Sequence, residues 1–367
     1  MKSPFDIVIL GLGPQGLFLL REFSRAGQNV LGLGLKGTVG LHSKYGYKLA
    51  LPQIEALDKI LPDFLHPKIS LHMTSDLFLN YMLKKHKKIF FEYECFPNYD
   101  SAVVFTVKTE TEKLARKLEI PCQRSVLLEN VDFSSYDIFP SIIKWNKRIG
   151  PEKFKTVVVY SREDLEIFRK EIRSTENLIV QKFIPGRRDA DMSFGGYFKN
   201  GCEQASIIIQ QKRQYPHPIG LASYVEEYRG DFVDEIISCS HRILRSTNYS
   251  GFVEVEFRVG QDDEKLYLIE VNPRACGWIK IIKAKMKNRG KVQIPNAARN
   301  SNRKASWVNL QRDIRANVDC LIKNRNEFCI TELVRSYLKN PIKDIFDIRD
   351  IKPFLCQFLR LLGDMRH

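Results

Sequence analysis

Residues 251–274 read GFVEVEFRVGQDDEKLYLIEVNPR, and this stretch predicts a β-hairpin that turns at Gln261–Glu264. Side chains alternate between the two faces of a strand, so the valines of the first strand share one face and its acidic residues share the other. With the turn centred near Asp263, Glu256 and Glu270 lie directly opposite each other, with Cβ atoms about 4.5–5.5 Å apart. The stretch therefore predicts two facing carboxylates on one side of an antiparallel pair.

Two facing carboxylates repel each other unless a cation lies between them. Their oxygens, together with the amide oxygen of Asn272, suit a Mg²⁺ ion that holds substrate phosphates. The alternative is an amphipathic hairpin whose charged face meets water. A metal site would require nucleotide-binding segments elsewhere, so the rest of the chain decides between the two interpretations.

The N-terminal segment predicts a strand, a glycine turn, a helix and a second strand. An apolar run at residues 5–10 precedes the turn GLGPQG at 11–16, a helix follows through Phe23, and residues 29–33 form the next strand. Such a turn can bind a dinucleotide pyrophosphate. A dinucleotide site also needs an acidic residue about 20 positions further on, and the interval 23–54 contains none. The favoured interpretation is a glycine turn that lets the helix pack close to the sheet.

Between residues 110 and 250, apolar strands alternate with charged helices, which predicts an α+β lobe or a pair of lobes. Helices are expected at 110–119 and at Asp234–Ser246. The expected strands are Ser141–Trp145, Thr156–Val159, Leu178–Gln181, Met192–Phe198 and Ser206–Ile209.

Two of these segments, read in order with the hairpin, resemble the ATP-grasp superfamily, which includes D-alanyl-D-alanine ligases, biotin carboxylases and carbamoyl-phosphate synthetases. FPSIIK at 139–144 resembles the family's strand that ends in a phosphate-binding lysine, and VQKFIPG at 180–186 resembles the strand that edges the adenine. The implied fold is α/β and α+β. It comprises a Rossmann-like domain preceding the grasp (1–110), a first ATP-grasp lobe (111–185), a second lobe with the metal hairpin (186–282) and a basic C-terminal extension (283–367).

The resemblance also implies roles for particular residues. The metal ligands would be Glu256, Glu270 and Asn272, and the catalytic arginines that stabilise the transferred phosphate would be Arg274 and Arg213. ATP would contact Lys144, Lys182, Gln181, Phe183, Ile184 and Asp191, with Asp189 as the alternative ribose contact. Two departures stand out: the phosphate-covering loop at 147–155 has only Gly150 where relatives have more glycine, and Gln181 replaces the glutamate of many members.

In particular, the chain is similar to uncharacterised carboxylate–amine ligases and to members resembling D-aspartate ligase, through QKRQYP at 211–216 and DIKP at 350–353. This implies an enzyme that uses ATP and Mg²⁺, or Mn²⁺, to activate a small carboxylate as an acyl phosphate and joins it to an amine acceptor. Candidate settings are cell-surface polysaccharide, peptidoglycan and specialised-metabolite synthesis. The alternative is a regulatory protein that binds ATP without turnover.

Most of the net charge of +15 lies late in the 367-residue chain, where 20 Lys and Arg stand against 8 Asp and Glu from Ala275 onward, a balance of +12. The excess suggests an anionic partner or a solvated face. Nucleic acid is the least favoured partner, because the region contains no known recognition module. The chain has no apolar run of about 18 residues, no secretory cleavage pattern and no paired cysteines, so we expect a cytoplasmic protein with reduced thiols. The oligomeric state does not follow from the sequence.

The end of the chain predicts a further helix at residues 353–365. Its apolar residues Phe354, Leu355, Phe358, Leu359, Leu361 and Leu362 share one broad face. That face either packs onto the protein or holds an anionic, sugar-linked or lipid-linked acceptor at the membrane periphery. In the second case it would act with the basic residues Lys280, Lys283, Lys285, Lys287, Arg289 and Lys291.

Overall fold

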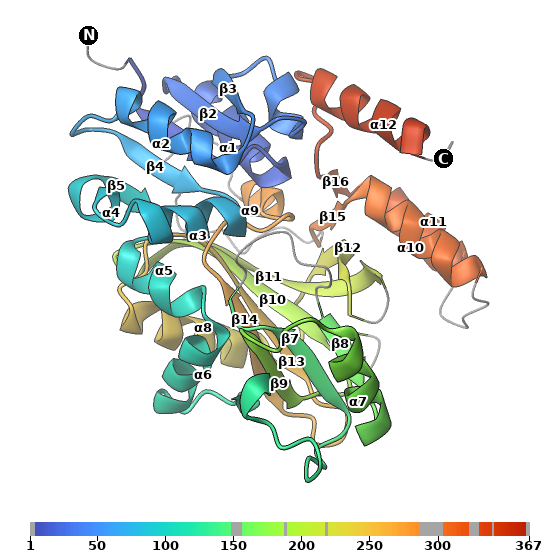
Figure 1. Ribbon diagram of the computed structural model, residues 1–367. Coiled ribbons are helices and arrows are strands. Elements are labelled where there is room, and N and C mark those ends of the chain that lie inside the picture. Colours follow the sequence, from blue (N-terminus) through green and yellow to red (C-terminus); the bar gives the residue numbers. More distant parts are fainter. Residues whose placement is uncertain are drawn as a thin grey trace.

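The computed structural model describes residues 4–147, 156–186, 189–216, 219–285, 304–322, 330–339 and 341–364. Three sheets make up its framework (Figure 1). The predicted mixture of an α/β domain and α+β lobes is confirmed. Every cysteine in the described residues is a free thiol.

The N-terminal sheet is parallel, with the strand order β3-β2-β1-β4-β5. Its strands are β1 (Ile7–Leu10), β2 (Val30–Leu35), β3 (Tyr47–Leu51), β4 (Ser70–Met73) and β5 (Glu94–Phe96). Helices α1 (Pro14–Arg25), α2 (Leu57–Ile60), α3 (Asp76–Lys85), α4 (Ile89–Glu92) and α5 (Tyr99–Phe105) connect and cover them. The predicted strand–turn–helix–strand start is confirmed.

The glycine turn between β1 and α1 is required by close packing. Gly11 has φ +99°, in the left-handed region that favours glycine. A Cβ atom on Gly16 would lie 1.9 Å from the carbonyl oxygen of Gly11. These two positions support the packing interpretation of the motif.

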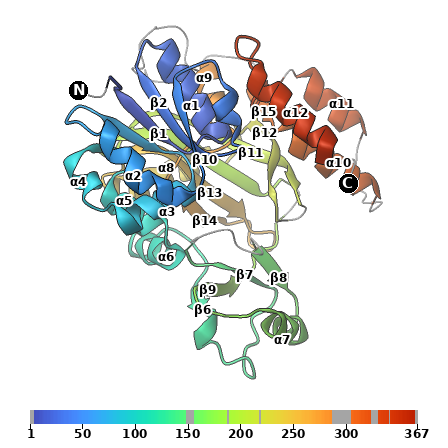
Figure 2. The same cartoon turned by 45° about the horizontal axis from the view of Figure 1, so that its top comes forward.

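The second sheet is antiparallel, with the order β6-β9-β7-β8. It contains β6 (Ser125–Leu127), β7 (Ser141–Trp145), β8 (Thr156–Val159) and β9 (Leu178–Lys182), is preceded by α6 (Lys108–Lys117) and carries α7 (Arg162–Glu171). The strands predicted at 141–145 and 156–159 match β7 and β8 residue for residue. The sheet and α7 form a lobe that projects away from the rest of the molecule (Figure 2).

The largest sheet has the order β14-β13-β10-β11-β12-β15-β16. Its strands are β10 (Asp191–Lys199), β11 (Cys202–Tyr215), β12 (Leu221–Glu227), β13 (Gly251–Val259), β14 (Leu266–Asn272), β15 (Ser306–Val308) and β16 (Ile342–Lys343). Helix α8 (Val233–Ser246), predicted at 234–246, buries Ile236 and Ile243 in one core with Val255 and Phe257 of β13. A second core joins α1 of the N-terminal domain to Ile207 and Trp278.

The C-terminal part of the chain is integrated into this fold, because β15 pairs with β12 and β16 pairs with β15. Helices α9 (Lys280–Lys285), α10 (Leu310–Ile322), α11 (Ile330–Leu338) and α12 (Lys352–Asp364) complete it. Part of the C-terminal extension predicted at 283–367 thus adds two strands to the large sheet, while the boundary at 283 stays a prediction. Of the predicted basic cluster, Lys287, Arg289 and Lys291 lie outside the described residues, as do the side chains of Lys283 and Lys285.

A buried ion pair fastens the segment before α12 to the N-terminal domain. Arg21 of α1 donates from Nε to Asp350 Oδ2 at 2.8 Å, and both side chains are 1% exposed. The hydroxyl of Ser43 and the backbone N–H of Lys44 also donate to the Asp350 carboxylate. The aspartate of the DIKP segment is thus an anchor between the two ends of the chain.

Candidate active site

The hairpin of β13 and β14 brings its two central carboxylates together. Glu256 pairs with Glu270, while the next pair toward the turn is Phe257 with Leu268. Ile269 is therefore an extra residue, and this bulge moves the pairing by one position. Because of the bulge, Leu268 and Val271 both enter the core while Glu270 faces Glu256. The predicted opposition of the two glutamates is confirmed, and the bulge is what produces it.

Hydrogen bonds hold the neighbouring polar side chains in fixed positions. Asn272 donates from Nδ2 to Glu256 Oε1 at 2.7 Å. The indole N–H of Trp278 donates to Glu254 Oε1 at 2.8 Å. The face of the hairpin thus carries three carboxylates and an amide in a largely buried network.

This donor set fits a hard divalent cation only with help from a ligand. The described residues contain no group of three or more His, Cys, Asp or Glu side chains that could hold a metal ion. Glu256, Glu270 and Asn272 would supply oxygen atoms, and phosphate oxygens with water would complete the shell, as is usual for Mg²⁺. The site is suited to a metal ion that arrives with a nucleotide.

Two lysines face these carboxylates. Lys144 at the end of β7 is 7% exposed. Burial and the nearby charge of Lys108 lower the pKa of Lys144 to about 8, although Glu270 and Glu256 oppose that change. Lys108, the first residue of α6, lies with Nζ 2.8 Å from Glu270 Oε1.

Lys108 is absent from the sequence-based site because the predicted helix began at residue 110. The sequence nevertheless contained a signal. The helix dipole disfavours a lysine at a helix N-terminus and favours one at the C-terminus. Such a placement points to a local anion.

A cavity of about 240 Å³ lies between the sheets and contains most of these groups. The first lobe contributes Lys144, Trp145 and Thr156, and α6, which packs on the core of the large sheet, contributes Lys108. The large sheet and its C-terminal additions contribute Glu254, Glu256, Glu270, Asn272, Arg274, Gln211, Trp278, Trp307 and Arg312. Gln15 at the start of α1 adds a residue of the N-terminal domain. The cavity is therefore lined by residues of the N-terminal domain, of the first lobe and of the large sheet with its C-terminal additions.

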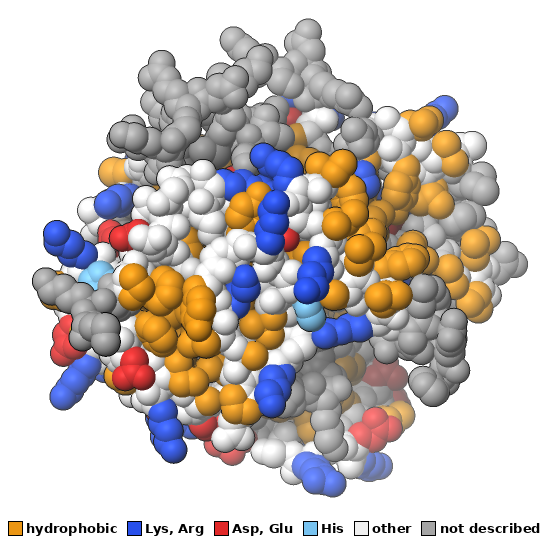
Figure 3. All heavy atoms as spheres, turned by 90° about the horizontal axis from the view of Figure 1, so that it is seen from above, with side chains coloured by type: hydrophobic (Ala, Val, Ile, Leu, Met, Phe, Trp, Pro, Cys, Tyr) orange, Lys and Arg blue, Asp and Glu red, His pale blue; other side chains and the backbone are white. Residues whose placement is uncertain are grey.

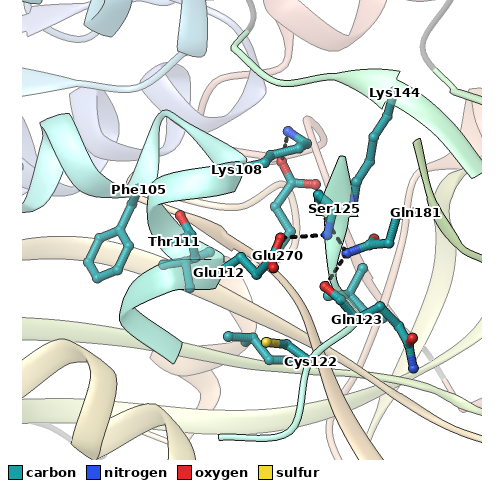
Figure 4. Close-up of a pocket in the computed structure, with 13 residues that line it drawn as sticks. Phe105, Lys108, Thr111, Glu112, Cys122, Gln123, Ser125, Lys144, Gln181 and Glu270 are labelled. Atoms are coloured by element: carbon teal, nitrogen blue, oxygen red, sulfur yellow. Dashed lines mark hydrogen bonds and ion pairs between the residues drawn. The ribbon is translucent and has the colours of Figure 1, made fainter. Parts of the chain in front are cut away.

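A smaller hollow, shown in Figure 4, adjoins the same lysines and Glu270. Gln181 of β9 reaches into it and donates from Nε2 to the carbonyl oxygen of Gln123 at 2.7 Å. Glu112 accepts from the backbone N–H of Ser125 at 2.8 Å. The walls of the hollow combine the apolar side chains of Phe105 and Leu268 with these polar groups. The hollow thus places polar and apolar groups together beside Lys108 and Lys144.

Arg274 lines the larger cavity just after β14. Its guanidinium donates to both carboxylate oxygens of Asp76, from Nε at 2.5 Å and from Nη2 at 3.2 Å. Burial disfavours its charge, but the Asp76 carboxylate more than offsets this and raises the pKa of Arg274. Arg274 is consequently a fixed cation at the edge of the carboxylate cluster.

Arg213 is not among the cavity residues. It donates from Nε and Nη2 to the two oxygens of the fully buried Asp313, both at 2.9 Å, and stacks over Tyr224. This ion pair, which joins β11 to α10, accounts for its position. A catalytic role for Arg213 therefore has no geometric support here.

The remaining predicted nucleotide residues occupy the strand end between the lobes. Asp191 accepts two hydrogen bonds from Arg258, which also lies over the ring of Phe183. Lys182 is exposed and Ile184 is buried. The alternative ribose contact, Asp189, pairs with Lys212 at 3.0 Å. None of these residues lines the two cavities described above, so their contact with ATP stays a prediction.

The arrangement of an N-terminal α/β domain, a small antiparallel lobe and a large, mainly antiparallel sheet with a carboxylate hairpin is the ATP-grasp fold. Among solved structures, the chain is similar to the N5-carboxyaminoimidazole synthetase of Staphylococcus aureus complexed with ADP, with a TM-score of 0.66, 15% identity and coverage of 89% of this chain and 87% of that one. The carboxyaminoimidazole ribonucleotide synthase of Aspergillus clavatus complexed with ATP has a TM-score of 0.64 and 12% identity, and the match covers 89% of this chain and 88% of that one. A Rhizobium etli pyruvate carboxylase has a TM-score of 0.60 and 15% identity, and the match covers 80% of this chain and 29% of that one.

At 12–15% sequence identity, the similarity to these solved structures shows the fold alone. No family model and no curated protein sequence matches the chain. In the described part of the chain, no helix is both long enough and apolar enough to cross a membrane.

Proposed function

We propose that this protein is an ATP-dependent carboxylate–amine ligase that works through an acyl-phosphate intermediate. The observation that carries the proposal is the opposed pair Glu256 and Glu270, which two lysines face across a cavity between the lobes. Facing carboxylates are costly unless cations lie nearby, and here ammonium groups are already present. Such a cluster suits a metal–triphosphate complex.

Each group has a role in this proposal. Glu256, Glu270 and Asn272 hold Mg²⁺, which would neutralise phosphate charge when bound, while Lys108 and Lys144 bind phosphate oxygens. Gln181 lies at the adenine side. Arg274, held by Asp76, stabilises the charge on the phosphoryl group that is transferred.

The chemistry needs no nucleophile from the protein. A carboxylate oxygen of the substrate attacks the terminal phosphorus of ATP, the bond to the bridging oxygen breaks, and ADP leaves. The amine then attacks the acyl carbon of the acyl phosphate, inorganic phosphate departs, and the amine loses a proton. The protein contributes position and electrostatic complementarity.

A panel of acids and amines, screened for release of ADP and phosphate, tests the proposal. Release that requires both an acid and an amine supports it, and release by Glu270→Gln at the wild-type rate contradicts it. Tight ATP binding without ADP formation across the panel would favour the regulatory alternative.

A second surface supports a finer proposal about the acceptor. The outer face of α12 exposes Leu355, Phe358 and Leu359, the last at 66%, and hydrophobic side chains gather on the right of Figure 3, the side on which α12 lies in Figure 1. Lys352 and Arg360 lie on the same helix. We propose that this face rests on an anionic membrane surface and gives access to a lipid-linked or sugar-linked acceptor.

Vesicle sedimentation at low salt tests this surface. Binding to vesicles that contain phosphatidylserine, lost in the double variant Phe358→Glu, Leu359→Glu, supports the proposal. Absence of binding by the wild-type protein contradicts it.

A further inference from the structure

The C-terminal end of the large cavity contains two groups that the proposed reaction does not use. Arg312 of α10 and Trp307 of β15 both line it. In the sheet, β10, β11 and β12 lie between β15 and the carboxylate hairpin. These two residues therefore come from a different region of the sheet than the carboxylates of the hairpin.

Arg312 differs from Arg274 in how its charge is balanced. Within the described residues Arg312 forms no ion pair, and its Nη1 donates to the carbonyl oxygen of Ala222 at 2.5 Å. Burial lowers the pKa of Arg312, and Asp344 supplies opposing charge. Asp344 itself accepts a hydrogen bond from Asn309. A partly buried guanidinium without a carboxylate in direct contact among the described residues favours an anionic ligand.

Trp307 provides an independent observation. The side chains of Trp278 and Trp307 both line the cavity, and the N–H of Trp278 donates to Glu254. The N–H of Trp307 is buried and has no acceptor among the described residues, although the residue is only 2% exposed. Buried indole N–H groups usually have a partner. An oxygen atom supplied by a ligand would satisfy this one.

We propose that Arg312 and Trp307 form a second anion-binding subsite, which holds a carboxylate or phosphate of the substrate apart from the carboxylate that is activated. This inference rests on the proposed ligase function and narrows its substrate class to molecules with at least two anionic groups. Gln211 of β11 and Gln15 of α1, which also line the cavity, offer amides for polar groups between the two ends.

Tryptophan fluorescence reports on this cavity directly, because all three tryptophans of the chain, Trp145, Trp278 and Trp307, line it. The nucleotide end is first saturated with Mg²⁺ and ADP. Succinate and inorganic phosphate are then titrated as probes, with the neutral succinamide as the uncharged control. The wild-type protein should give a saturable change with succinate or phosphate and little with succinamide.

Substitutions identify the residues that bind the anion and cause the fluorescence change. Arg312→Gln should lower the affinity for succinate or phosphate at least about tenfold, as expected for loss of a charge-assisted contact. Arg312→Lys should retain part of that affinity. Trp307→Phe keeps the ring but loses the N–H and should weaken binding by a smaller factor. Arg315→Gln, an exposed arginine on the same helix, is the matched control and should behave as wild type.

Two results overturn the subsite: no saturable response of the wild-type protein to either dianion, or equal affinity in Arg312→Gln and wild type. Unchanged affinity of each variant for Mg²⁺ and ADP shows that it is folded. If the wild-type protein does not bind Mg²⁺ and ADP, the proposed ligase function fails, and the succinate and phosphate titrations without nucleotide still test the subsite. If nucleotide binds and only the Arg312 dependence is absent, the subsite alone fails.

Discussion

Lys108 Nζ lies 2.8 Å from Glu270 Oε1, so the first residue of α6 contacts a residue of β14 that is 162 positions away in the chain. This ion pair joins α6 to the hairpin of β13 and β14. It places a positive charge where the phosphates of ATP would lie in the proposed reaction. A nucleotide that binds there would exchange one anionic partner of Lys108 for another.

Lys108→Ala should therefore weaken ATP binding by about 1.5–3 kcal/mol, because it removes one charge-assisted contact to phosphate. Isothermal titration with Mg²⁺ and a non-hydrolysable ATP analogue measures the change. Lys113→Ala removes an exposed lysine of the same helix and should bind as wild type. Equal affinities for the two variants would remove Lys108 from the site.

The lowered pKa of Lys144 predicts that nucleotide binding depends on pH. Its pKa in the free protein is lowered to about 8, and bound phosphate would raise that value by favouring the charged form. Affinity should consequently fall as the pH rises from 7 to 9, and binding near pH 8.5 should take up protons. Titrations in two buffers of different ionisation enthalpy measure the uptake, which should be absent in Lys144→Met.

The lowered pKa of Lys144 also makes the folding stability depend on pH. The folded pKa of Lys144 lies below the unfolded value of 10.5, so the unfolded chain binds more protons between about pH 8 and 10.5. Stability contributed by this residue therefore rises with pH across that window. Lys144→Met should stabilise the nucleotide-free protein at pH 7, and the gain should shrink at pH 10 in denaturant titrations.

The buried pair of Arg21 and Asp350 should be the main anchor of the C-terminal segment. Asp350→Ala leaves Arg21 buried without its carboxylate and should cost about 3–5 kcal/mol of unfolding free energy. Asp347→Ala, which breaks a more exposed pair with Arg25, should cost about 1 kcal/mol. Similar losses in the two variants, measured by urea unfolding, would argue against Asp350 as the anchor.

Local patterns predicted much of the fold. The runs at 141–145 and 156–159 are rich in Ile and Val, and such runs favour strands. By contrast, β11 was expected at 206–209 but extends over Cys202–Tyr215. Its second half is polar, and pairing with β12 keeps it extended despite weak local preference.

The geometry of the hairpin was predictable because it depends on local pairing, whereas contacts between distant segments were not. Glu256 and Glu270 belong to one hairpin, so the period of two was enough to place them. Arg213 pairs with Asp313, 100 residues later, and nothing local to either residue indicates that contact. Lys108 and Arg312 likewise reach the cavity only through the packing of separate segments.

The central claim is that the opposed glutamates bind a metal–nucleotide complex, and Glu270→Gln tests it most directly. The substitution keeps the shape of the side chain and removes one charge, so the melting temperature should stay within about 4 °C of wild type. Glu166→Gln, at an exposed position on α7, serves as the control.

The decisive measurement is the Mg²⁺ dependence of ADP release by purified wild-type and Glu270→Gln protein, with the acid and amine that give the fastest wild-type rate. The proposed function predicts Mg²⁺-dependent release by wild type and by Glu166→Gln, and no release above background by Glu270→Gln at any Mg²⁺ concentration. Release by Glu270→Gln with the wild-type rate and the wild-type Mg²⁺ dependence would contradict the claim.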